Sequence, residues 1–391
     1  MEKKRILLVH NFYQIGGGEH VVFENEKNML QENGYAVFTY TRSNEELKKN
    51  KWKLLLLPFT TSWSFQTFVQ VRRQIRKHNI HVVHCHNTFP LISPAVYYAA
   101  RSLKVPVVQT VHNFRFLCPN GLFFCNGAIC EQCREKNSFR PALENRCYRN
   151  SRVQTAVAAA MLMLHRWLGT YRKISYIFLT EFNKEKFRDL VDIRGENLFV
   201  KPNFVSIPEG NPARKAEKPV FIFLGRLDAY KGIDFLLETW PQLPEAYELH
   251  IYGDGACRKA CEDAAENNAN IHFHGFCPQE VVFEALERAT ALLFPSDLYE
   301  GFPMSVAESF ALGKPVVATN LGNQKDLVRA SGGGVTFSPR NKEEFRDALA
   351  EVTDNYERYS ACGQRYYRDN LVKSRNYEKL SEIYDKVQHI R

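Results

Sequence analysis

Two glutamates and the turn that separates them carry the densest chemistry of the sequence. They stand in the stretch Phe294-Pro-Ser-Asp-Leu-Tyr-Glu300-Gly-Phe-Pro-Met-Ser-Val-Ala-Glu308. A carboxylate accepts several hydrogen bonds, so it can hold both hydroxyls of a vicinal diol, as in ribose or a hexose. Pro303 is favoured in the first turn of a helix, and the N–H groups of that turn attract an anion. The stretch therefore predicts a site for hydroxyl groups beside a phosphate.

Two cations earlier in the chain fit the same chemistry. Arg226 follows Gly225, and Lys231 precedes Gly232, just after an apolar run that reads as a strand. Fixed positive charges stabilise a diphosphate that leaves with growing negative charge. The sequence contains no Asp-x-Asp motif, so we expect catalysis to need no metal or other cofactor. The alternative is that Arg226 and Lys231 form surface ion pairs and that Glu308 is a solvated helix residue.

Four motifs, in order across residues 219–328, resemble the retaining glycosyltransferases of family 4, which have the GT-B fold. The motifs are Gly225-Arg226-Leu227 with Lys231-Gly232, Phe273-His-Gly275-Phe276, Glu-x7-Glu, and Gly313-Lys-Pro-Val-Val-Ala-Thr-Asn-Leu-Gly322. The resemblance implies that Glu308 holds the ribose and Glu300 the donor sugar. The donor site that it implies comprises Gly17, Gly18, Arg226, Lys231, Gly275, Phe276, Glu300, Gly301, Phe302, Pro303, Met304, Ser305 and Glu308. The catalytic groups that it implies are His112, Glu300, Arg226 and Lys231.

The first half of the chain offers a glycine run and a histidine at predicted strand ends. Gly16, Gly17 and Gly18 follow the first apolar run and precede a helical pattern, so the backbone there can approach an anion. The spacing does not match the dinucleotide fingerprint Gly-x-Gly-x-x-Gly. The resemblance implies a loop beside the donor phosphates; the alternative is a simple strand-to-helix turn.

His112 ends a strand and, by resemblance, faces the donor sugar, whereas the alternative is a packed histidine. His84 and His86 alternate on one strand and receive no role.

A cluster of cysteines lies in the segment 118–147. Cys130 and Cys133 have the spacing of a zinc knuckle, and Cys118, Cys125 and Cys147 lie nearby in the sequence. Clustered cysteines in a reducing compartment favour a metal over disulfides. We therefore expect a structural zinc on Cys118, Cys130, Cys133 and Cys147, with Cys125 able to replace one ligand. The alternative is a set of free thiols.

Short apolar runs alternate with longer amphipathic stretches along the whole chain. This alternation predicts an α/β protein with two doubly wound Rossmann-like domains facing across a cleft, the GT-B arrangement. The expected strands are 5–10, 35–40, 81–86, 105–111, 175–179, 219–224, 248–252, 271–274, 291–294 and 315–318.

The proline-rich segment 202–219 is the expected linker. The expected domains are 1–204, on the acceptor side with the cysteine insert 118–147, and 205–373, which binds the nucleotide sugar. Residues 374–391 are expected to form a helix that, by resemblance, packs back on the first domain.

Charge is unevenly distributed over the two halves. Residues 1–205 are basic and residues 206–391 are acidic, within a net charge of +9. A basic half can face anionic lipid head groups or a phosphate-bearing acceptor, although a solvated surface is the alternative. The helical stretch 153–168 is apolar with basic ends, as expected of a membrane-surface helix or of a core helix. The sequence shows no long apolar run and no recognisable signal sequence, so we expect a cytoplasmic protein. If the basic first half binds lipid, the protein would lie at the inner face of the membrane.

These observations favour a retaining hexosyltransferase of polysaccharide or glycoconjugate biosynthesis. It would move a sugar from a nucleotide-sugar donor, with a UDP-sugar expected, to a glycan or lipid-linked acceptor. An alternative is a nucleotide-sugar epimerase on the same scaffold, which would turn over donor with no acceptor present. Another is a phosphorylase, which would need a pyridoxal phosphate lysine and a longer chain. A nucleic-acid-binding module is disfavoured by the acidic second half and by the lack of a DNA- or RNA-reading motif.

Overall fold

The computed structural model describes residues 4–13, 17–49, 51–188, 197–207 and 218–389. The chain divides into two compact units, and each is described by itself. The first unit comprises Met1–Cys125, Cys130–Asn203 and Asn376–Arg391, and the second comprises Asn126–Ile129 and Phe204–Arg375. Gly16 and most of the predicted linker 202–219 lie outside the described residues.

The first unit is built on a six-stranded sheet in which all neighbouring strands are parallel. Its strands, in sheet order, are β2 (Ala36–Ser43), β1 (Arg5–Phe12), β3 (Val82–Asn87), β4 (Val107–Val111), β7 (Ser175–Phe178) and β8 (Leu198–Val200). β3 and β4 are buried throughout, as strands covered on both faces must be. The carboxyl ends of β1, β3 and β4 thus share one edge, where loops and helix N-termini meet.

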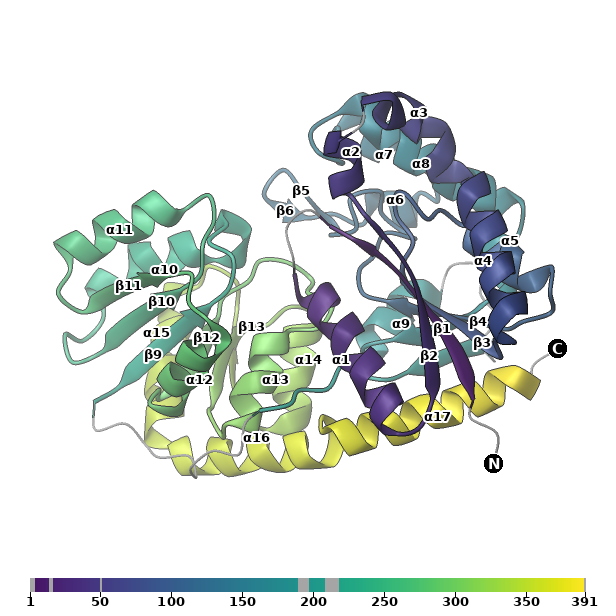
Figure 1. Ribbon diagram of the computed structural model, residues 1–391. Coiled ribbons are helices and arrows are strands. Elements are labelled where there is room, and N and C mark those ends of the chain that lie inside the picture. The colour runs from purple at the N-terminus through teal and green to yellow at the C-terminus, as the bar shows by residue number, and fades with distance from the viewer. Residues whose placement is uncertain (1–3, 14–16, 50, 189–196, 208–217, 390–391) are drawn as a thin grey trace. The chain divides into compact units, whose positions relative to one another are not determined.

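Helices flank this sheet, as Figure 1 shows. They are α1 (Gly18–Glu32), α2 (Glu45–Lys49), α3 (Lys51–Ser62), α4 (Phe65–His78), α5 (Ala95–Arg101), α6 (Gln132–Glu135), α7 (Arg140–Glu144), α8 (Arg152–Trp167), α9 (Glu181–Arg188) and α17 (Lys373–His389). A small hairpin, β5 (Phe124–Cys125) with β6 (Ala128–Ile129), lies in the cysteine insert.

The last helix of the chain, α17, lies along the first unit. Tyr35 Oη is 2.9 Å from Ser381 Oγ, and the Tyr384 hydroxyl is 2.7 Å from His84 Nδ1. Lys4 forms an ion pair with Asp385 at the far end of α17. Because these contacts join both ends of the chain, the first unit is closed by residues that are remote in sequence.

The second unit also has six parallel strands, in the order of a Rossmann fold. In sheet order they are β11 (Ile271–Gly275), β10 (Glu248–Tyr252), β9 (Val220–Leu224), β12 (Ala291–Phe294), β13 (Val316–Thr319) and β14 (Gly334–Phe337). From β9 the chain builds toward β11, and β12 then returns to the other side of β9. The loops after β9 and β12 therefore flank the topological switch point, where α/β sheets bind ligands.

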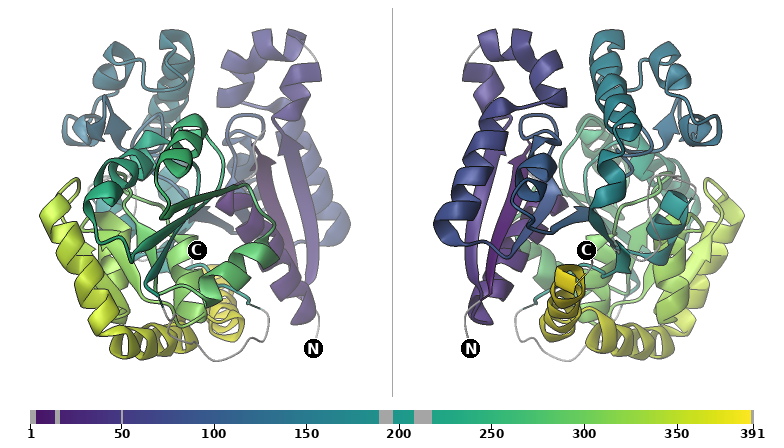
Figure 2. Two further views of the ribbon diagram at one scale, coloured as in Figure 1. Left: turned by 90° about the vertical axis from the view of Figure 1, so that its left-hand side faces the viewer. Right: turned by 90° about the vertical axis from the view of Figure 1, so that its right-hand side faces the viewer.

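Helices cover both faces of this second sheet (Figures 1 and 2). They are α10 (Ile233–Thr239), α11 (Arg258–Asn267), α12 (Gln279–Glu287), α13 (Met304–Ala311), α14 (Gly322–Ser331), α15 (Lys342–Asp354) and α16 (Tyr356–Asn370). Successive strand residues point to opposite faces, so Phe221 and Phe223 enter one core and Ile222 the other. One core is closed by α10, α11 and α15, and the other by α12, α13 and α14.

The predicted fold class is confirmed: each unit has one parallel α/β sheet. All ten predicted strands are present, with ends that move by a few residues at most. Four short strands were missed: β5 and β6 with two residues each, β8 with three and β14 with four. None of these runs is long enough to show a period, and β14 begins at a glycine, which reads as a loop signal. Within the described part of the chain, no helix has the length and apolarity needed to span a bilayer.

Candidate active site

A glycine turn brings the lysine of the second unit to the switch point. Gly232 has a φ of +79°, and a Cβ built on it would lie 2.1 Å from the carbonyl oxygen of Pro295. Only glycine tolerates both conditions, so the turn that ends in Gly232 can lie directly on the loop after β12. The amide of Asp297 donates to the carbonyl of Tyr230 at 3.0 Å and holds the two loops together. Lys231 therefore projects beside the loop after β12.

Lys231 and Glu300 form an ion pair at this point. Lys231 Nζ donates to Glu300 Oε1 at 2.7 Å, and Ser296 Oγ donates to the same oxygen at 2.6 Å. Asn323 Nδ2 donates to the carbonyl oxygens of Glu300 and Gly301, the latter at 3.0 Å, and anchors the turn before α13. The side chains of Lys231 and Glu300 are both mostly buried. The structure thus joins two predicted site residues and adds two that the sequence did not single out, Ser296 and Asn323.

Arg226 lies on the loop after β9, on the same edge of the sheet. Its side chain is 60% exposed, and its guanidinium pairs with Asp228 at 2.7 Å and contacts the Tyr230 hydroxyl. The tight turn that it follows depends on Gly253, whose Cβ would lie 1.8 Å from the carbonyl oxygen of Gly225. Arg226 is thus a surface ion-pair partner, as in the alternative interpretation, but one held at the ligand-binding edge.

Glu308 lies on α13, whose N-terminus faces the same turn. Pro303 is the N-cap, and no side chain caps this end of the helix. Gly301, Phe302, Met304 and Ser305 of the predicted donor site form this turn and the first helical residues. Burial raises the pKa of Glu308 to about 7, because desolvation disfavours the charged carboxylate. Within the described residues Glu308 has no ion-pair partner, so the structure does not bring it to Lys231 or Arg226.

The predicted base-binding turn follows β11. Gly275 has a φ of +68°, and the amide of Gly253 donates to its carbonyl oxygen at 2.8 Å. This bond ties the turn to the loop after β10. Phe276 is 79% exposed, which presents an aromatic face to any ring that stacks on it.

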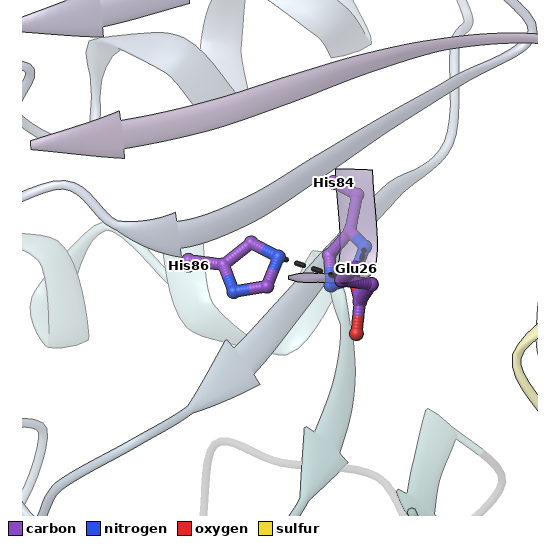
Figure 3. A group of neighbouring side chains, drawn as sticks. All are labelled: Glu26, His84 and His86. Atoms are coloured by element: carbon purple, nitrogen blue, oxygen red, sulfur yellow. Dashed lines mark ion pairs between the residues drawn. The ribbon is translucent and has the colours of Figure 1, made fainter. Parts of the chain in front are cut away.

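In the first unit, His112 joins a buried chain of polar side chains. His112 Nε2 lies 3.0 Å from His86 Nδ1, with the two rings stacked. His86 Nε2 lies 3.2 Å, and His84 Nδ1 3.1 Å, from Glu26 Oε1. Figure 3 shows the His86 ring pointing at this carboxylate, with His84 beside it. Burial and the neighbouring His86 hold the pKa of His112 well below its usual value, so the ring is neutral.

Lys201 completes this group from the other side. Its Nζ lies 3.0 Å from Glu26 Oε2 and 2.9 Å from Asn376 Oδ1 of α17, and all these side chains are buried. Burial alone would raise the pKa of Glu26, but Lys201, His84 and His86 outweigh it and hold the pKa well below its usual range. Glu26 is therefore an anion in the interior. Sequence reasoning missed it, although Glu26 interrupts the apolar stripe of α1 that includes Val22 and Met29, and this was the available signal.

The glycine loop and a pocket lie at the same edge of the first sheet. Gly17 is the N-cap of α1, which begins at Gly18, and no side chain caps this end. The pocket is lined by Glu19, His112 and Arg115, among others. Burial raises the pKa of Glu19 to about 8, and the nearby guanidinium of Arg115 opposes that shift. Glu19 and Arg115 are further polar residues of this edge that the sequence did not single out.

The five cysteines of the insert lie near one another, but no three of their sulfurs converge. Among the described residues, the groups of three or more side chains whose ligand atoms could share an ion contain no cysteine. Cys147 Sγ and Cys125 Sγ are 3.7 Å apart. Burial raises the pKa of Cys133 to about 11, so this thiol is neutral as long as no cation is bound to it. The zinc predicted on Cys118, Cys130, Cys133 and Cys147 does not fit the thiols as they stand, and it stays a prediction.

Two family models together match most of the chain. The model of the Glycosyltransferase Family 4 matches residues 15–207, and that of the Glycosyl transferases group 1 matches residues 209–369. These two ranges contain every residue of the predicted donor site, including Gly17, Lys231, Glu300 and Glu308. The match therefore rests on both units.

Comparison with individual proteins gives the same result as the two family models. The chain is 26% identical over 157 residues to the lipopolysaccharide 1,6-galactosyltransferase of Salmonella typhimurium, which covers 38% of this chain and 44% of that enzyme. The chain spans about half the length of the curated relatives it matches. Its fold resembles a glycosyltransferase from Rickettsia africae (TM-score 0.71, 14% identity, 100% of both chains). It also resembles Anabaena HepE in complex with UDP (TM-score 0.65, 15% identity, 98% of this chain and 99% of that one). The chain therefore belongs to the glycosyltransferases of family 4, with the GT-B fold.

Proposed function

We propose that the protein transfers a hexose from a UDP-sugar to a glycan or lipid-linked acceptor, with retention of the anomeric configuration. The observation that carries this proposal is the Lys231–Glu300 pair at the switch point, beside the uncapped N-terminus of α13. A cation and a helix N-terminus suit a diphosphate, and a carboxylate suits sugar hydroxyls. A relative that is named a galactosyltransferase and a structural neighbour that holds UDP support the hexose and the uridine nucleotide.

The pair explains how one site can serve both parts of the donor. The ammonium group of Lys231 has three N–H donors, and Glu300 takes one of them. The remaining donors are available for the diphosphate while Glu300 stays in place. Within the described residues, Glu300 Oε2 accepts no hydrogen bond, which leaves it for a sugar hydroxyl. Arg226, exposed on the neighbouring loop, supplies the second cation.

The transfer itself needs no protein nucleophile. The bond from the anomeric carbon to the diphosphate oxygen breaks, and a bond from that carbon to the acceptor oxygen forms on the same face. The departing diphosphate takes the acceptor's proton, so atoms and charges balance. Negative charge grows on the diphosphate during this step, and Lys231, Arg226 and the α13 N-terminus stabilise it.

His112 would contribute a defined hydrogen-bond acceptor to the sugar. His86 Nε2 lies 3.2 Å from Glu26 Oε1, and with the His86 proton on that nitrogen His86 Nδ1 would accept from His112 Nε2–H. His112 Nδ1 then carries a lone pair that can accept from a sugar hydroxyl. Glu26 and His86 would act as positioning residues, since neither needs to touch the substrate.

A donor screen with acceptor analysis tests the proposal. Purified protein is offered several nucleotide sugars, with and without glycan or lipid-linked acceptors, and nucleotide release is measured. Acceptor-dependent release, with an α-linked product by NMR from an α-linked donor, is the expected result. Turnover of donor without an acceptor would favour the epimerase instead, and a β-linked product would exclude retention.

We also propose that the acceptor side of the first unit lies on an anionic membrane surface. The face of α8 that is not buried carries Val153, Met163 and Trp167, and Trp167 is 83% exposed. Phe59 of the adjoining α3 and Phe65 of α4 are exposed as well. Exposed apolar side chains gathered on neighbouring helices are typical of an interaction surface.

The positive charge beside these exposed apolar side chains favours anionic lipid as their partner. Arg73, Arg76 and Lys77 are exposed on α4, and the sequence has no acidic residue from 47 to 130. Basic side chains beside an apolar face favour anionic head groups.

Vesicle sedimentation tests this surface. We expect binding to vesicles with anionic lipid, and clearly weaker binding for Trp167→Ser. Phe276→Ser, which removes an equally exposed aromatic ring from the second unit, should bind like the parent. Equal binding to neutral and anionic vesicles, or no effect of Trp167→Ser, would contradict the proposal.

A further inference from the structure

Four side chains with metal-binding chemistry share one face at the edge of the second sheet. Glu248 and His250 stand two residues apart on β10, and His272 and His274 stand two apart on β11. β10 and β11 are parallel neighbours (Figure 1), and their register sets His250 beside His272. Because alternate residues of a strand point to the same side, all four side chains project from the same face. β11 is the outermost strand, and Glu248, His250 and His272 are only half-buried, so solvent and ions can reach them.

Three of these residues offer ligand atoms to a common point. One ligand atom each of Glu248, His250 and His272 lies within 4.8 Å of the other two. In a tetrahedral zinc site, ligand atoms about 2.1 Å from the ion are about 3.4 Å from one another. The three side chains therefore need to close by less than about 1 Å each. Half-exposed side chains on adjacent strands can make this movement without a change in the backbone.

An unsatisfied nitrogen points to the ligand. His250 Nε2 is buried and has no hydrogen-bond partner, and the nearest carboxylate oxygen that it meets, Glu248 Oε2, is 3.6 Å away. A buried polar atom without a partner is costly, and a bound ion removes that cost. The other nitrogen of this ring, Nδ1, lies 3.0 Å from His274 Nε2. Its proton can be donated to His274, which leaves the Nε2 lone pair for a metal.

The surroundings keep this arrangement in place. The ring of His274 stacks on Tyr252 with centroids 4.3 Å apart and planes within 10°. His274 is thus fixed as the hydrogen-bond partner that orients His250. Glu248 has one competing partner, Lys218, whose Nζ is 3.4 Å from Oε1 and whose side chain is 73% exposed. An exposed ion pair of this kind contributes little and leaves Oε2 for an ion.

The first unit also contains a group of side chains with metal-binding chemistry, but that group is buried. Glu26, His84 and His86 also have ligand atoms close together (Figure 3). There, however, the ammonium group of Lys201 lies 3.0 Å from Glu26 and already neutralises it. Both ring nitrogens of His84 also have hydroxyl partners already, Tyr384 and Thr110, so this group is less suited to a metal than the edge site. The edge site has no cation among the described residues other than the exposed Lys218.

We propose that Glu248, His250 and His272 bind one divalent ion of the class that prefers imidazole ligands, such as Zn²⁺. Two imidazoles and one carboxylate with a coordination position open to water form a common ligand set for such ions. The ion links β10 to the outermost strand β11, whose end carries the turn with Gly275 and Phe276. It therefore stabilises the edge of the second sheet.

Zinc titration of the full-length chain tests this site. The protein is reduced, stripped with a chelator and titrated with Zn²⁺ by calorimetry, in parallel with variants. We expect His272→Ala to bind one ion fewer per chain than the parent, whatever the cysteine insert binds, because the insert is the same in both. His274→Ala removes an orienting partner and not a ligand, so its affinity at this site should fall by about 10- to 100-fold. Saturating Zn²⁺ should raise the unfolding midpoint of the parent more than that of His272→Ala.

His78→Ala is the matched control, since this half-buried histidine stacks on Phe38 of the first unit and belongs to neither of the groups of converging ligand atoms found among the described residues. It should bind as many ions as the parent. If His272→Ala does not fold, Glu248→Gln keeps the shape of the side chain and should lose the same ion. Equal stoichiometry in the parent and in these variants would overturn the proposal. None of these measurements depends on sugar transfer, so the metal site and the proposed function stand or fall separately.

Discussion

At the scale of single residues, the Lys231–Glu300 pair has two consequences. It shields a partly buried carboxylate, and it holds a lysine where a leaving diphosphate would need one. A lysine on a mobile side chain would have to be ordered during the reaction, whereas this one is ordered beforehand by Glu300. Ordered charge of this kind lowers a barrier most effectively because nothing has to reorganise.

Replacing this lysine should reduce transfer far more than it reduces stability. For Lys231→Ala we expect turnover to fall by about 100- to 1,000-fold, as on removal of one fixed electrostatic donor. The free energy of unfolding should fall by about 1–3 kcal/mol, because the mostly buried Glu300 carboxylate loses its cationic partner but keeps the hydrogen bond from Ser296. Steady-state kinetics and urea unfolding measure both quantities. Lys259→Ala, which removes an exposed lysine paired with Asp263 on α11, is the control and should leave turnover unchanged. Near-parental turnover of Lys231→Ala would exclude the assigned role.

The raised pKa of Glu308 predicts a pH-dependent affinity. Burial brings this pKa to about 7, so the carboxylate gains a proton as the pH falls through neutrality. The ionised form accepts strong hydrogen bonds on both oxygens, whereas the protonated form carries an O–H donor on one of them and is a weaker acceptor for the two ribose hydroxyls. The affinity for a UDP-sugar should therefore rise from about pH 6 to about pH 8, by up to about tenfold per unit below the pKa.

Calorimetry over this range is the measurement, with Glu308→Gln as the comparison. A UDP-sugar is the appropriate probe because its diphosphate is esterified at both ends and does not titrate near neutrality. The glutamine variant should bind more weakly at pH 8 and show a flat profile. The same pH slope in both proteins would assign the titration to another group.

At the scale of elements, close approach of two loops decides whether the site forms. The turn after β9 can lie on the loop after β12 only because Gly232 has no side chain. Gly34, at the end of α1, has a similar φ of +84° but open space where a Cβ would be. A substitution at Gly34 therefore introduces backbone strain alone, whereas one at Gly232 introduces strain and a steric clash.

Alanine at each position should reveal this difference. Gly34→Ala should cost about 1 kcal/mol from its positive φ alone and leave turnover near that of the parent. Gly232→Ala adds a clash with a carbonyl oxygen, so it should destabilise the second unit by more and move Lys231 away from Glu300. We expect turnover to fall along with stability. Unfolding monitored by the fluorescence of Trp240, which is fully buried in the second unit, gives the stability. Similar losses for the two variants would show that strain alone accounts for the effect.

At the scale of the whole molecule, one buried charge network joins distant parts of the chain. Glu26 belongs to α1, His86 to β3, and Lys201 follows β8, while Asn376 belongs to the final helix. Their contacts lie inside the first unit, where no water compensates for a missing partner. The network therefore makes the closure of this unit depend on polar side chains from four sequence regions.

Removing its central anion should be strongly destabilising. Glu26→Gln leaves the ammonium group of Lys201 buried without a counter-charge, which costs about 3–5 kcal/mol. Glu24→Gln, on the same helix, breaks only the partly exposed pair with Lys27 and should cost about 1 kcal/mol or less. Urea unfolding of the two variants provides the measurement. A double variant, Glu26→Gln with Lys201→Met, should recover part of the loss, and failure to do so would show that the pairing is not its cause.

The sequence alone determined the secondary structure, the fold class and the chemical types in the site. Strand and helix periods are local, so ten strands were predicted from residues a few positions apart. Because parallel strands end at a common edge, motifs that follow β9, β12 and β4 could be assigned to ligand-binding edges before any coordinates. Gly225-Arg226, Lys231 and Glu300 were found in this way.

Only the tertiary structure decided which of these groups meet. The Lys231–Glu300 pair depends on β12 returning to the side of β9, and the order of strands in a sheet leaves no local period in the sequence. The same holds for Glu26 with His86 and Lys201, whose partners come from separate elements. The edge site needs the register of β10 on β11 to set His250 beside His272. Contacts of this kind form between residues far apart in the chain, so packing in three dimensions, and not the residue types, determines their geometry.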